Sequence, residues 1–447
     1  MSIKHINKVL MVITVFVMFI FTFAGCRKTD ERMTEQQVPK DGRTVLTLGY
    51  FDYNSVSEQV KDYVDAFNQT NATYRIEIQD YSESEDCDTA FNLDVSAGKT
   101  PDIIVTAGER LDKLIHMGLL TDMQSLLDED PELCRDDFME SVMSAWLEEE
   151  KLYYMAPKYH IATTFGKQEM VGKFSDGWTK EEMIDYAESL DVPLFYENDK
   201  MTMFNTFMGS GYSEFVDWNT GKAAFDSDVF TRILRYCDQG VKNSDRFPIG
   251  EEWVSEFRNG EYAVTSLPVS HFSDIEDITR VFGKDLCYVG AANAYRDTAG
   301  IFFEECFSIS SKSKYQDVAW EFVRSLLTKD AQYQLCKDFR NLSVRKDVFA
   351  MMKKAAMTTE TYTDAYGTEI KPWQETSPTM EYTPLSQEEA DLVEQLVMRA
   401  KHCIKVDKKI DDIVYDEVSA YFNGDCTIDR VGETINSRVE TYMNENQ

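Results

Sequence analysis

Apolar residues recur along the first part of the chain with two alternating periods, one typical of strands and one typical of helices. Gly98 follows the second helical segment and Gly118 interrupts the third, and glycine commonly stands where a helix ends. We expect strands at 44–51, 74–81 and 101–108 and helices at 57–71, 89–98 and 110–123. This alternation predicts a mostly parallel sheet covered by helices.

The pattern is less regular after residue 150. An extended run at 151–170 is interrupted by Pro157, where we expect the chain to change direction. Helical periods then dominate, above all at 315–339 and 385–447. In α/β sheets, ligands bind beyond the carboxyl ends of the strands, so the loops after the first and third strands are candidate ligand loops.

The net charge of the chain makes some classes of binding partner unfavourable. It has 79 acidic and 46 basic residues among 447, a formal net charge of −33, which repels nucleic acid backbones. High solubility is the plainer interpretation of this charge. A hydrophobic content of 43% allows a sizeable core, so the chain is not a disordered one.

The N-terminal segment has the layout of a bacterial export signal. Lys4 and Lys8 precede an apolar run at 9–25, and Cys26 follows it. The string FAGC resembles a bacterial lipobox, with Phe23 where leucine is usual. A cysteine after small residues offers a thiol for lipidation.

We therefore expect residues 1–25 to be a signal peptide, Cys26 to be lipidated and 26–43 to be a flexible tether. The folded body would then lie outside the cytoplasm, anchored to the cell membrane through the lipid. A retained membrane-spanning helix is the alternative, because seventeen apolar residues are at the lower limit for crossing a bilayer.

Motifs for catalysis and metal binding receive little support. The pattern S-x-x-K occurs at Ser343–Lys346 and Ser311–Lys314, but no KTG or SDN element accompanies it. The histidines beyond the signal have no metal-binding spacing, and no CxxC occurs; these histidines are His116, His160, His271 and His402. Eight cysteines besides Cys26 are widely spaced, and we expect buried free thiols. We expect no enzyme activity, no metal and no cofactor.

Six segments, in this order, resemble motifs of the extracellular solute-binding proteins of bacterial ABC importers, family 1, the maltodextrin-binding type. They are SAGKTPDIIVTAGERLDKLIHMGLLTDM, KLYYMAP, GWTKEEM, EFRNGEYAVTS, SISSKSKYQDVAWEFVRSLLTKDAQ and NLSVRKDV. The last departs from the family pattern at Ser343, where proline is usual. The resemblance covers nearly all of 44–447.

The resemblance implies a periplasmic-binding-protein-like α/β fold with two lobes, each a mostly parallel sheet flanked by helices, hinged around a ligand cleft. The first lobe would comprise 44–156 and 291–342, and the second 157–290 and 343–447. Only the crossing at Pro157 is also indicated by the chain's own pattern. A monomer that delivers a solute to the transmembrane permease subunits of an importer is implied as well.

The loops expected to face the cleft are rich in aromatic rings and in hydrogen-bonding groups. Rings stack on the apolar faces of sugars, and carboxylates and amides accept hydrogen bonds from hydroxyl groups. The candidate ligand residues are Tyr50, Asp52, Tyr53, Thr106, Glu109, Tyr159, His160, Phe204, Trp218, Ser270, His271, Phe302, Phe303 and Trp373. Core packing is the competing interpretation for Phe204, Trp218 and Phe303.

The leading hypothesis is a membrane-tethered binding protein that captures a carbohydrate, in the first instance an oligosaccharide, and hands it to a permease. Two alternatives stay open. A binding protein for another solute, such as a peptide, a polyamine or an anion, would have the same fold. A secreted hydrolase on the same tether would need a close pair of carboxylates or a catalytic triad in the cleft.

Overall fold

The computed structural model describes residues 41–445 except 52–54, 85, 243–247, 249, 298, 338–340, 359–361, 364–368 and 371–382. The chain divides into two units, 1–44 and 45–447, and every helix among the described residues lies in the second. The predicted signal peptide, Cys26 and nearly all of the tether lie outside the described residues. No helix in the described part of the chain is long and apolar enough to cross a membrane.

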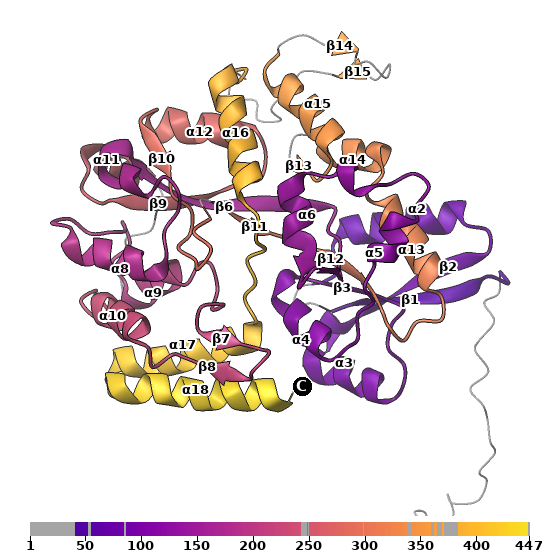
Figure 1. Ribbon diagram of the computed structural model, residues 1–447, viewed down its shortest axis with the longest axis horizontal. Helices are drawn as coiled ribbons and strands as arrows, with labels where there is room; N and C mark the ends of the chain where they lie inside the picture. Colours follow the sequence, from indigo (N-terminus) through magenta and orange to yellow (C-terminus); the bar gives the residue numbers. More distant parts are fainter. Residues whose placement is uncertain are drawn as a thin grey trace, which may run out of the picture. The chain divides into compact units, whose positions relative to one another are not determined.

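The first sheet has the strand order β12-β3-β1-β2 (Figure 1). Its strands are β1 (Thr44–Tyr50), β2 (Tyr74–Asp80), β3 (Ile103–Thr106) and β12 (Cys306–Ile309). The three strands expected from the early pattern are all present. Strand β1 pairs parallel with β3, whereas β12 joins the other side of β3 antiparallel, with Phe307 opposite Val105. The sheet therefore combines segments that are about two hundred positions apart.

The second sheet is organised around one long strand, β6 (Lys158–Lys167). Its partners are β9 (Val264–Val269), β10 (Leu286–Tyr288), β11 (Gly300–Phe302) and β13 (Leu342–Ser343). Every one of these ladders is antiparallel, which differs from the expected mostly parallel arrangement. Ten residues of β6 leave room for several short partners along its length. Gly166 lets β9 approach, because a Cβ there would lie 2.5 Å from the carbonyl oxygen of Ala263.

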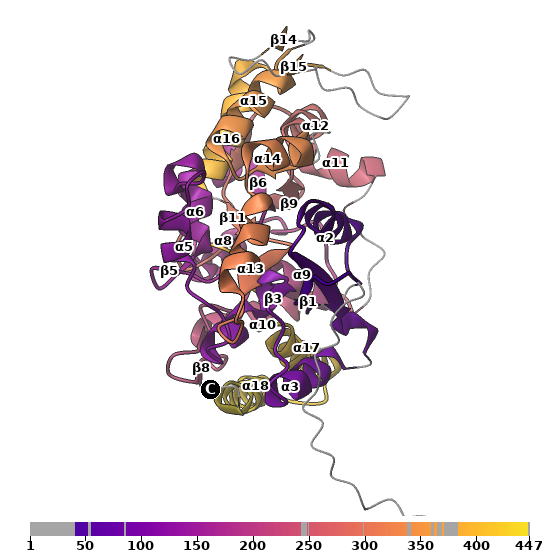
Figure 2. The same cartoon turned by 90° about the vertical axis from the view of Figure 1, so that its right-hand side faces the viewer.

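Helices surround both sheets. Those in the first half of the chain are α2 (Glu58–Thr70), α3 (Cys87–Ser96), α4 (Leu111–His116), α5 (Gln124–Asp128), α6 (Glu140–Trp146), α7 (Gln168–Val171), α8 (Lys180–Ser189) and α9 (Lys200–Phe207). The others are α10 (Asp228–Cys237), α11 (Gly250–Asn259), α12 (Ser273–Phe282), α13 (Gln316–Ser325), α14 (Lys329–Cys336), α15 (Lys346–Ala356), α16 (Gln387–Arg399), α17 (Lys408–Asn423) and α18 (Ile428–Glu445). The last two, drawn in yellow, pack side by side in Figures 1 and 2.

Short two-stranded ribbons complete the fold. They are β4 (Leu147–Glu148) with β5 (Lys151–Leu152), β7 (Val216–Asp217) with β8 (Lys222–Ala223), and β14 (Tyr362–Thr363) with β15 (Glu369–Ile370). The β7–β8 ribbon also contacts α18. The turn between β7 and β8 contributes to the site described below.

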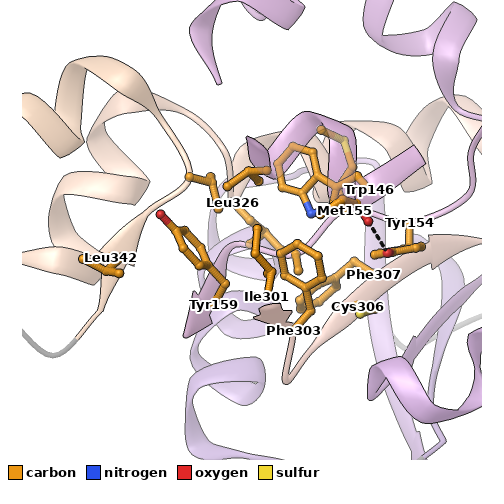
Figure 3. Packing of buried hydrophobic residues seen from close by; sticks show 14 of the residues in the cluster. Trp146, Tyr154, Met155, Tyr159, Ile301, Phe303, Cys306, Phe307, Leu326 and Leu342 are labelled. Atoms are coloured by element: carbon orange, nitrogen blue, oxygen red, sulfur yellow. Dashed lines mark hydrogen bonds between the residues drawn. The ribbon is translucent and has the colours of Figure 1, made fainter. Parts of the chain in front are cut away.

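Two separate hydrophobic cores hold the body together. In the first, the rings of Trp146 and Tyr154 pack against Phe303, with centroids 6.2 and 5.9 Å away (Figure 3). The second lies among α8, α9, α10, α17 and α18 and includes Phe230 and Val414. The eight described cysteines form no disulfide, and five of them are buried, so they act mainly as small core residues.

Phe165 on β6 tests how tightly the first core is packed. Its ring is fully buried, and the centroids of Phe257, Phe282 and Tyr288 lie 5.9, 5.3 and 5.5 Å from it. We expect Phe165→Ala to lower the free energy of unfolding by about 3–5 kcal/mol, because it removes a large ring and leaves a cavity. Urea denaturation followed by circular dichroism measures this loss.

The matched control is Tyr415→Ala, since the Tyr415 side chain is 51% exposed on α17. It should change the free energy of unfolding by less than about 0.5 kcal/mol. Equal effects of the two substitutions would contradict the described packing around β6.

Candidate functional site

A pocket of about 750 Å³ opens beside the end of α4, and this volume lies within the range of small-molecule sites. Four separate parts of the chain line it. They are the 112–116 end of α4, the 144–153 segment around β4, the 210–219 segment around β7, and the 401–410 segment that leads into α17; Tyr295 adds one further side chain.

Trp218 reaches the pocket from the turn between β7 and β8. The carboxylate of Asp217 accepts hydrogen bonds from the backbone N–H groups of Asn219 and Thr220 and from the Thr220 hydroxyl, which closes the turn. The indole ring of Trp218 lies 5.3 Å from the His116 ring at an angle of 31°. The turn chemistry therefore presents an aromatic face next to the end of α4.

A second pair of rings stands on the Tyr295 side of the pocket. The rings of Tyr295 and His402 are stacked, with centroids 3.7 Å apart and planes within 6°. The tyrosine is 58% exposed and lines the pocket, so part of its ring is open to a ligand. Nδ1 of His402 lies 2.5 Å from a carboxylate oxygen of Asp297, which orients the imidazole.

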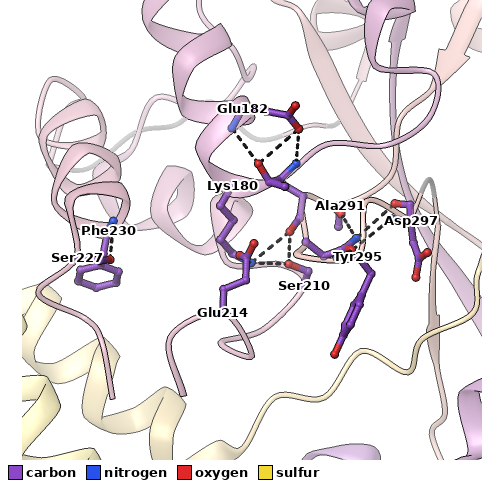
Figure 4. A network of polar contacts seen from close by, with 12 residues as sticks. Lys180, Glu182, Ser210, Glu214, Ser227, Phe230, Ala291, Tyr295 and Asp297 are labelled. Carbon is purple, nitrogen blue, oxygen red and sulfur yellow. Dashed lines mark hydrogen bonds and ion pairs between the residues drawn. The ribbon is translucent and has the colours of Figure 1, made fainter. Parts of the chain in front are cut away.

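The loop that carries Tyr295 is held by the side chain of Asn293. Its amide oxygen accepts hydrogen bonds from the N–H groups of Tyr295 and Asp297, at 2.9 and 3.3 Å, and its amide nitrogen donates to the carbonyl of Ala291 (Figure 4). An amide that satisfies three backbone groups in this way leaves the loop few alternative conformations. The exposed ring is consequently preorganised.

Lys405 bridges two of the segments that line the pocket. Its Nζ lies 2.9 Å from Oδ1 of Asp112 and 2.5 Å from Oε1 of Glu148. Burial by itself would lower the pKa of Lys405, but the two carboxylates overcome this effect and leave the pKa raised, so the ammonium stays charged. Burial also raises the pKa of Glu148, against the opposing effect of Lys405.

The backbone of Lys405 lies so close to the backbone of Gly211 that a side chain at position 211 would clash with it. Gly211 has φ +81°, and a Cβ there would lie 2.4 Å from the carbonyl oxygen of Lys405. The neighbouring residue Ile404 donates its N–H to the carbonyl of Ile301 at 2.7 Å, and the N–H of Ile301 donates to His402. The 401–405 segment is thus attached to β11 and to the 210–213 loop at once.

Asp407 begins helix α17 at the edge of the pocket. Its Oδ1 accepts hydrogen bonds from the N–H groups of Lys409 and Ile410, and its Oδ2 accepts one from the hydroxyl of Tyr442. Burial raises the pKa of Asp407 to about 6, although these hydrogen bonds act in the other direction.

A buried lysine, Lys180, contacts two of the loops that contribute to the pocket. Nζ of Lys180 donates to the hydroxyl of Ser210 at 2.7 Å and to the carbonyl of Ala292 at 3.2 Å, and it pairs with Glu214 at 2.7 Å (Figure 4). Burial lowers its pKa despite the carboxylate. This network connects the 210–214 loop to the loop that carries Tyr295.

A family model described as bacterial extracellular solute-binding protein matches residues 62–364, about two thirds of the chain. The chain belongs to this family. The resemblance to solute-binding proteins that the six sequence motifs indicated is therefore confirmed. No curated protein sequence matches the chain.

Solved structures of solute-binding proteins have the same fold. The ABC substrate-binding protein Lmo0181 from Listeria monocytogenes, in complex with cycloalternan, is 15% identical with a TM-score of 0.52, covering 90% of this chain and 99% of its own. The sugar-binding protein MalE from Xanthomonas citri is 14% identical with a TM-score of 0.52, covering 90% and 98%. The predicted two-lobed periplasmic-binding-protein-like α/β fold is confirmed.

In this solute-binding protein, one of the predicted ligand residues, Trp218, lines the pocket. Several others are at most 5% exposed, and these are Tyr50, Thr106, Tyr159, Phe204 and Phe303. Phe303 packs among the rings of the first core and Phe204 in the second core, so neither presents a face to a ligand in this conformation.

Two further predicted residues are brought together near the start of β6. The rings of His160 and Phe302 are stacked, 5.1 Å apart at 16°, because the two residues are partners in the β6–β11 ladder. Nδ1 of His160 lies 3.6 Å from Glu304, whose carboxylate also pairs with Lys158 at 3.1 Å. The hydrogen bond from His160 and the charge of Lys158 lower the pKa of Glu304 to about 2.

The remaining predicted residues do not meet at the pocket. The N–H groups of Ser270 and His271 donate to the carboxylate of Asp274, at the start of α12. Three predicted residues lie outside the described part of the chain, and these are Asp52, Tyr53 and Trp373. Glu109 is in the described backbone, but its side chain is not among the described ones.

Most of the residues that line the pocket were not among those predicted from the sequence. Tyr295, His402, Lys405 and Glu148 belong to segments with no shared motif, and only the fold brings them together. The one local signal was the turn chemistry of Asn293, which could have marked the loop of Tyr295 as ordered. Among the described residues, no group of three or more histidine, cysteine or acidic side chains is placed to hold a metal ion.

Replacing Lys405 with methionine should destabilise this solute-binding protein. It removes the ammonium and leaves Asp112 and Glu148 facing each other without a cation, which we expect to cost on the order of 2–4 kcal/mol at pH 7.5. Without the cation, Glu148, whose pKa burial already raises, binds a proton more readily in the folded state, so the loss should shrink as the pH falls towards 5. Urea denaturation at the two pH values measures both effects.

The control is Lys408→Met, because Lys408 is 39% exposed and pairs with Asp411 and Asp412 on the surface of α17. It should change the free energy of unfolding by less than about 1 kcal/mol. A loss for Lys405→Met that is no larger, or that does not depend on pH, contradicts a stabilising role for the bridge.

Proposed function

We propose that this solute-binding protein captures a carbohydrate, in the first instance an oligosaccharide, in the described pocket and delivers it to the permease of an ABC importer. The family supports a solute-binding role. Two proteins of similar fold also support a sugar as the solute: Lmo0181 is in complex with cycloalternan, and MalE from Xanthomonas citri is a sugar-binding protein. No covalent step forms part of the proposal.

The observation that carries the proposal is the combination of two aromatic pairs with hydrogen-bonding groups in one pocket. Trp218 beside His116 and Tyr295 on His402 offer ring faces that can stack on the apolar faces of pyranose rings. Carboxylates and the amide of Asn219 stand around them and accept or donate hydrogen bonds to hydroxyl groups.

The lobe boundaries remain part of the proposal. With lobes at 44–156 plus 291–342 and at 157–290 plus 343–447, Asp112 and Glu148 come from the first and Lys405 from the second. The Lys405 bridge then crosses the cleft, and closure of the lobes would assemble the site. The predicted residues away from the pocket, such as His160 and Phe302, remain candidates for contacts in another conformation.

Carbohydrate binding can be tested by isothermal titration calorimetry against a panel of neutral oligosaccharides, peptides and polyamines. We expect an oligosaccharide to bind with micromolar or tighter affinity. For that ligand, Trp218→Ala and Tyr295→Ala should each weaken binding at least about tenfold, because each removes a stacking surface. Tyr415→Ala, an exposed ring outside the pocket, is the control and should leave the affinity unchanged.

Binding of a peptide or polyamine without any sugar would overturn the carbohydrate proposal. Sugar binding that survives both pocket substitutions would place the site elsewhere, and the residues around His160 would then be the next to test.

We infer separately that Cys26 is lipidated and anchors the mature protein on the outer side of the cell membrane as a monomer. Support comes from the sequence alone, since this residue lies outside the described part of the chain. Cys26→Ala should release the protein from the membrane fraction or block its processing, while ligand binding by the body is unaffected. Fractionation and mass spectrometry of the N-terminus measure this. Membrane retention with an unchanged mass would instead support a retained helix.

A further inference from the structure

Charged side chains of the two signs are unequally represented around the pocket. Five carboxylates line it against two ammonium groups, namely Asp112, Glu148, Glu149, Asp217 and Asp407 against Lys401 and Lys405. An anionic ligand would need one of the two ammonium groups to be available for pairing. A cationic or neutral ligand would instead contact the carboxylates.

The more buried ammonium group is already engaged. Nζ of Lys405 lies within 2.9 Å of carboxylate oxygens on both Asp112 and Glu148. An anionic ligand would have to share this cation with two carboxylates, or displace one of them and leave it uncompensated. Lys401 is exposed, so its charge is well solvated and attracts an anion only weakly.

Two of the pocket carboxylates contact the β7–β8 turn that carries Trp218. Asp217 accepts its hydrogen bonds from Asn219 and Thr220 in the β7–β8 turn, and Glu149 accepts one at 3.1 Å from the side-chain amide of Asn219. All of these donors are neutral, and no ion pair involves either carboxylate in the described part of the chain. Both side chains are exposed, and both line the pocket.

Both carboxylates line the same pocket as Trp218, the residue on which a sugar would stack in the proposed function: Asp217 precedes Trp218 in the chain, and Glu149 bonds Asn219, which follows it. A negative group on that sugar would come within a few ångströms of like charges, well inside the screening length of about 8 Å at physiological salt. Because both carboxylates are exposed, solvent weakens this repulsion as it weakens the attraction of Lys401, and we expect the two carboxylates together to reduce binding by about tenfold. A protonated amino group at the same place would instead form charge-assisted hydrogen bonds with Asp217 or Glu149.

We propose that the pocket admits uncharged and amino sugars and rejects sugars that carry carboxylate, sulfate or phosphate groups, with Asp217 and Glu149 as the residues that discriminate. This inference rests on the proposed carbohydrate-binding function and adds the chemical class of the ligand. Neither residue was among the ligand residues predicted from the sequence.

The test compares matched ligands that differ only in charge. Neutral trisaccharides of glucose, mannose and galactose are titrated into the full-length body, each beside the same trisaccharide oxidised at C6 to the uronate. A glucosamine trisaccharide supplies the positive member. For whichever neutral trisaccharide binds, we expect its uronate to bind at least about tenfold more weakly at 0.15 M salt, and the difference to shrink as salt is raised.

The discriminating residues are tested with Asp217→Asn, Glu149→Gln and the double variant. The Oδ1 of asparagine can keep the two backbone hydrogen bonds of the turn, and its amide nitrogen can donate to the Thr220 hydroxyl, so the fold should be retained, and circular dichroism checks this. The readout is the ratio of the uronate Kd to the neutral Kd, which should fall about tenfold in the double variant. The matched control is Asp62→Asn with Asp65→Asn on exposed positions of α2, which changes the net charge equally but lies outside the pocket.

The possible outcomes distinguish a failure of the charge inference from a failure of the proposed carbohydrate binding. Equal or tighter binding of uronates by the unaltered protein overturns the charge inference while leaving carbohydrate binding intact. A ratio that the control pair alters as much as the pocket pair does also overturns it, since the effect would then come from overall charge. Failure of every sugar to bind, whatever its charge, contradicts the carbohydrate proposal itself.

Discussion

The arrangement of the pocket depends on the ammonium group of Lys405. Asp112 and Glu148 both pair with this cation, so one ammonium group compensates two partly buried carboxylates. The backbone of the same residue rests on Gly211, which has no side chain to block it. One residue therefore joins the end of α4, the β4 segment and the 210–213 loop.

The aromatic surfaces follow from this constraint and from two local devices. The 401–405 segment that holds Lys405 also carries His402, and the imidazole in turn supports the exposed ring of Tyr295. On the other side, the β7–β8 turn places Trp218 against His116, and α4 supplies Asp112 four residues before this histidine. Charge pairing and ring placement are thus parts of one assembly, so a change at Lys405 should be felt at both aromatic pairs.

Most of the fold could be predicted from the pattern of apolar positions. The strands at 44–51, 74–81 and 101–108 occur within two residues of the expected bounds, because alternation of side chains reports directly on which face is buried. The direction of pairing in the second sheet could not be predicted in this way. Strand β6 is antiparallel to all its partners, and periodicity alone carries no information on strand direction.

The candidate site was only partly accessible from the sequence. Trp218 was proposed for its ring type and its irregular surroundings, and it lines the pocket. Phe204 and Phe303 were proposed on similar grounds, yet they are core residues, since a ring in a sequence looks the same whether it packs inside or faces a cavity. Exposure is a property of the packed chain and has no local signature.

The sequence by itself determined the family, the α/β character of the body and the order of its elements, because those depend on local periodicity and on short motifs. The tertiary structure alone decided which side chains meet. Glu148, Tyr295 and Lys405 are separated by more than a hundred positions each, and they share a pocket because the 401–405 segment pairs with β11 and passes over Gly211. Contacts of that kind arise from chain crossings and close approaches, which spacing along a sequence does not encode.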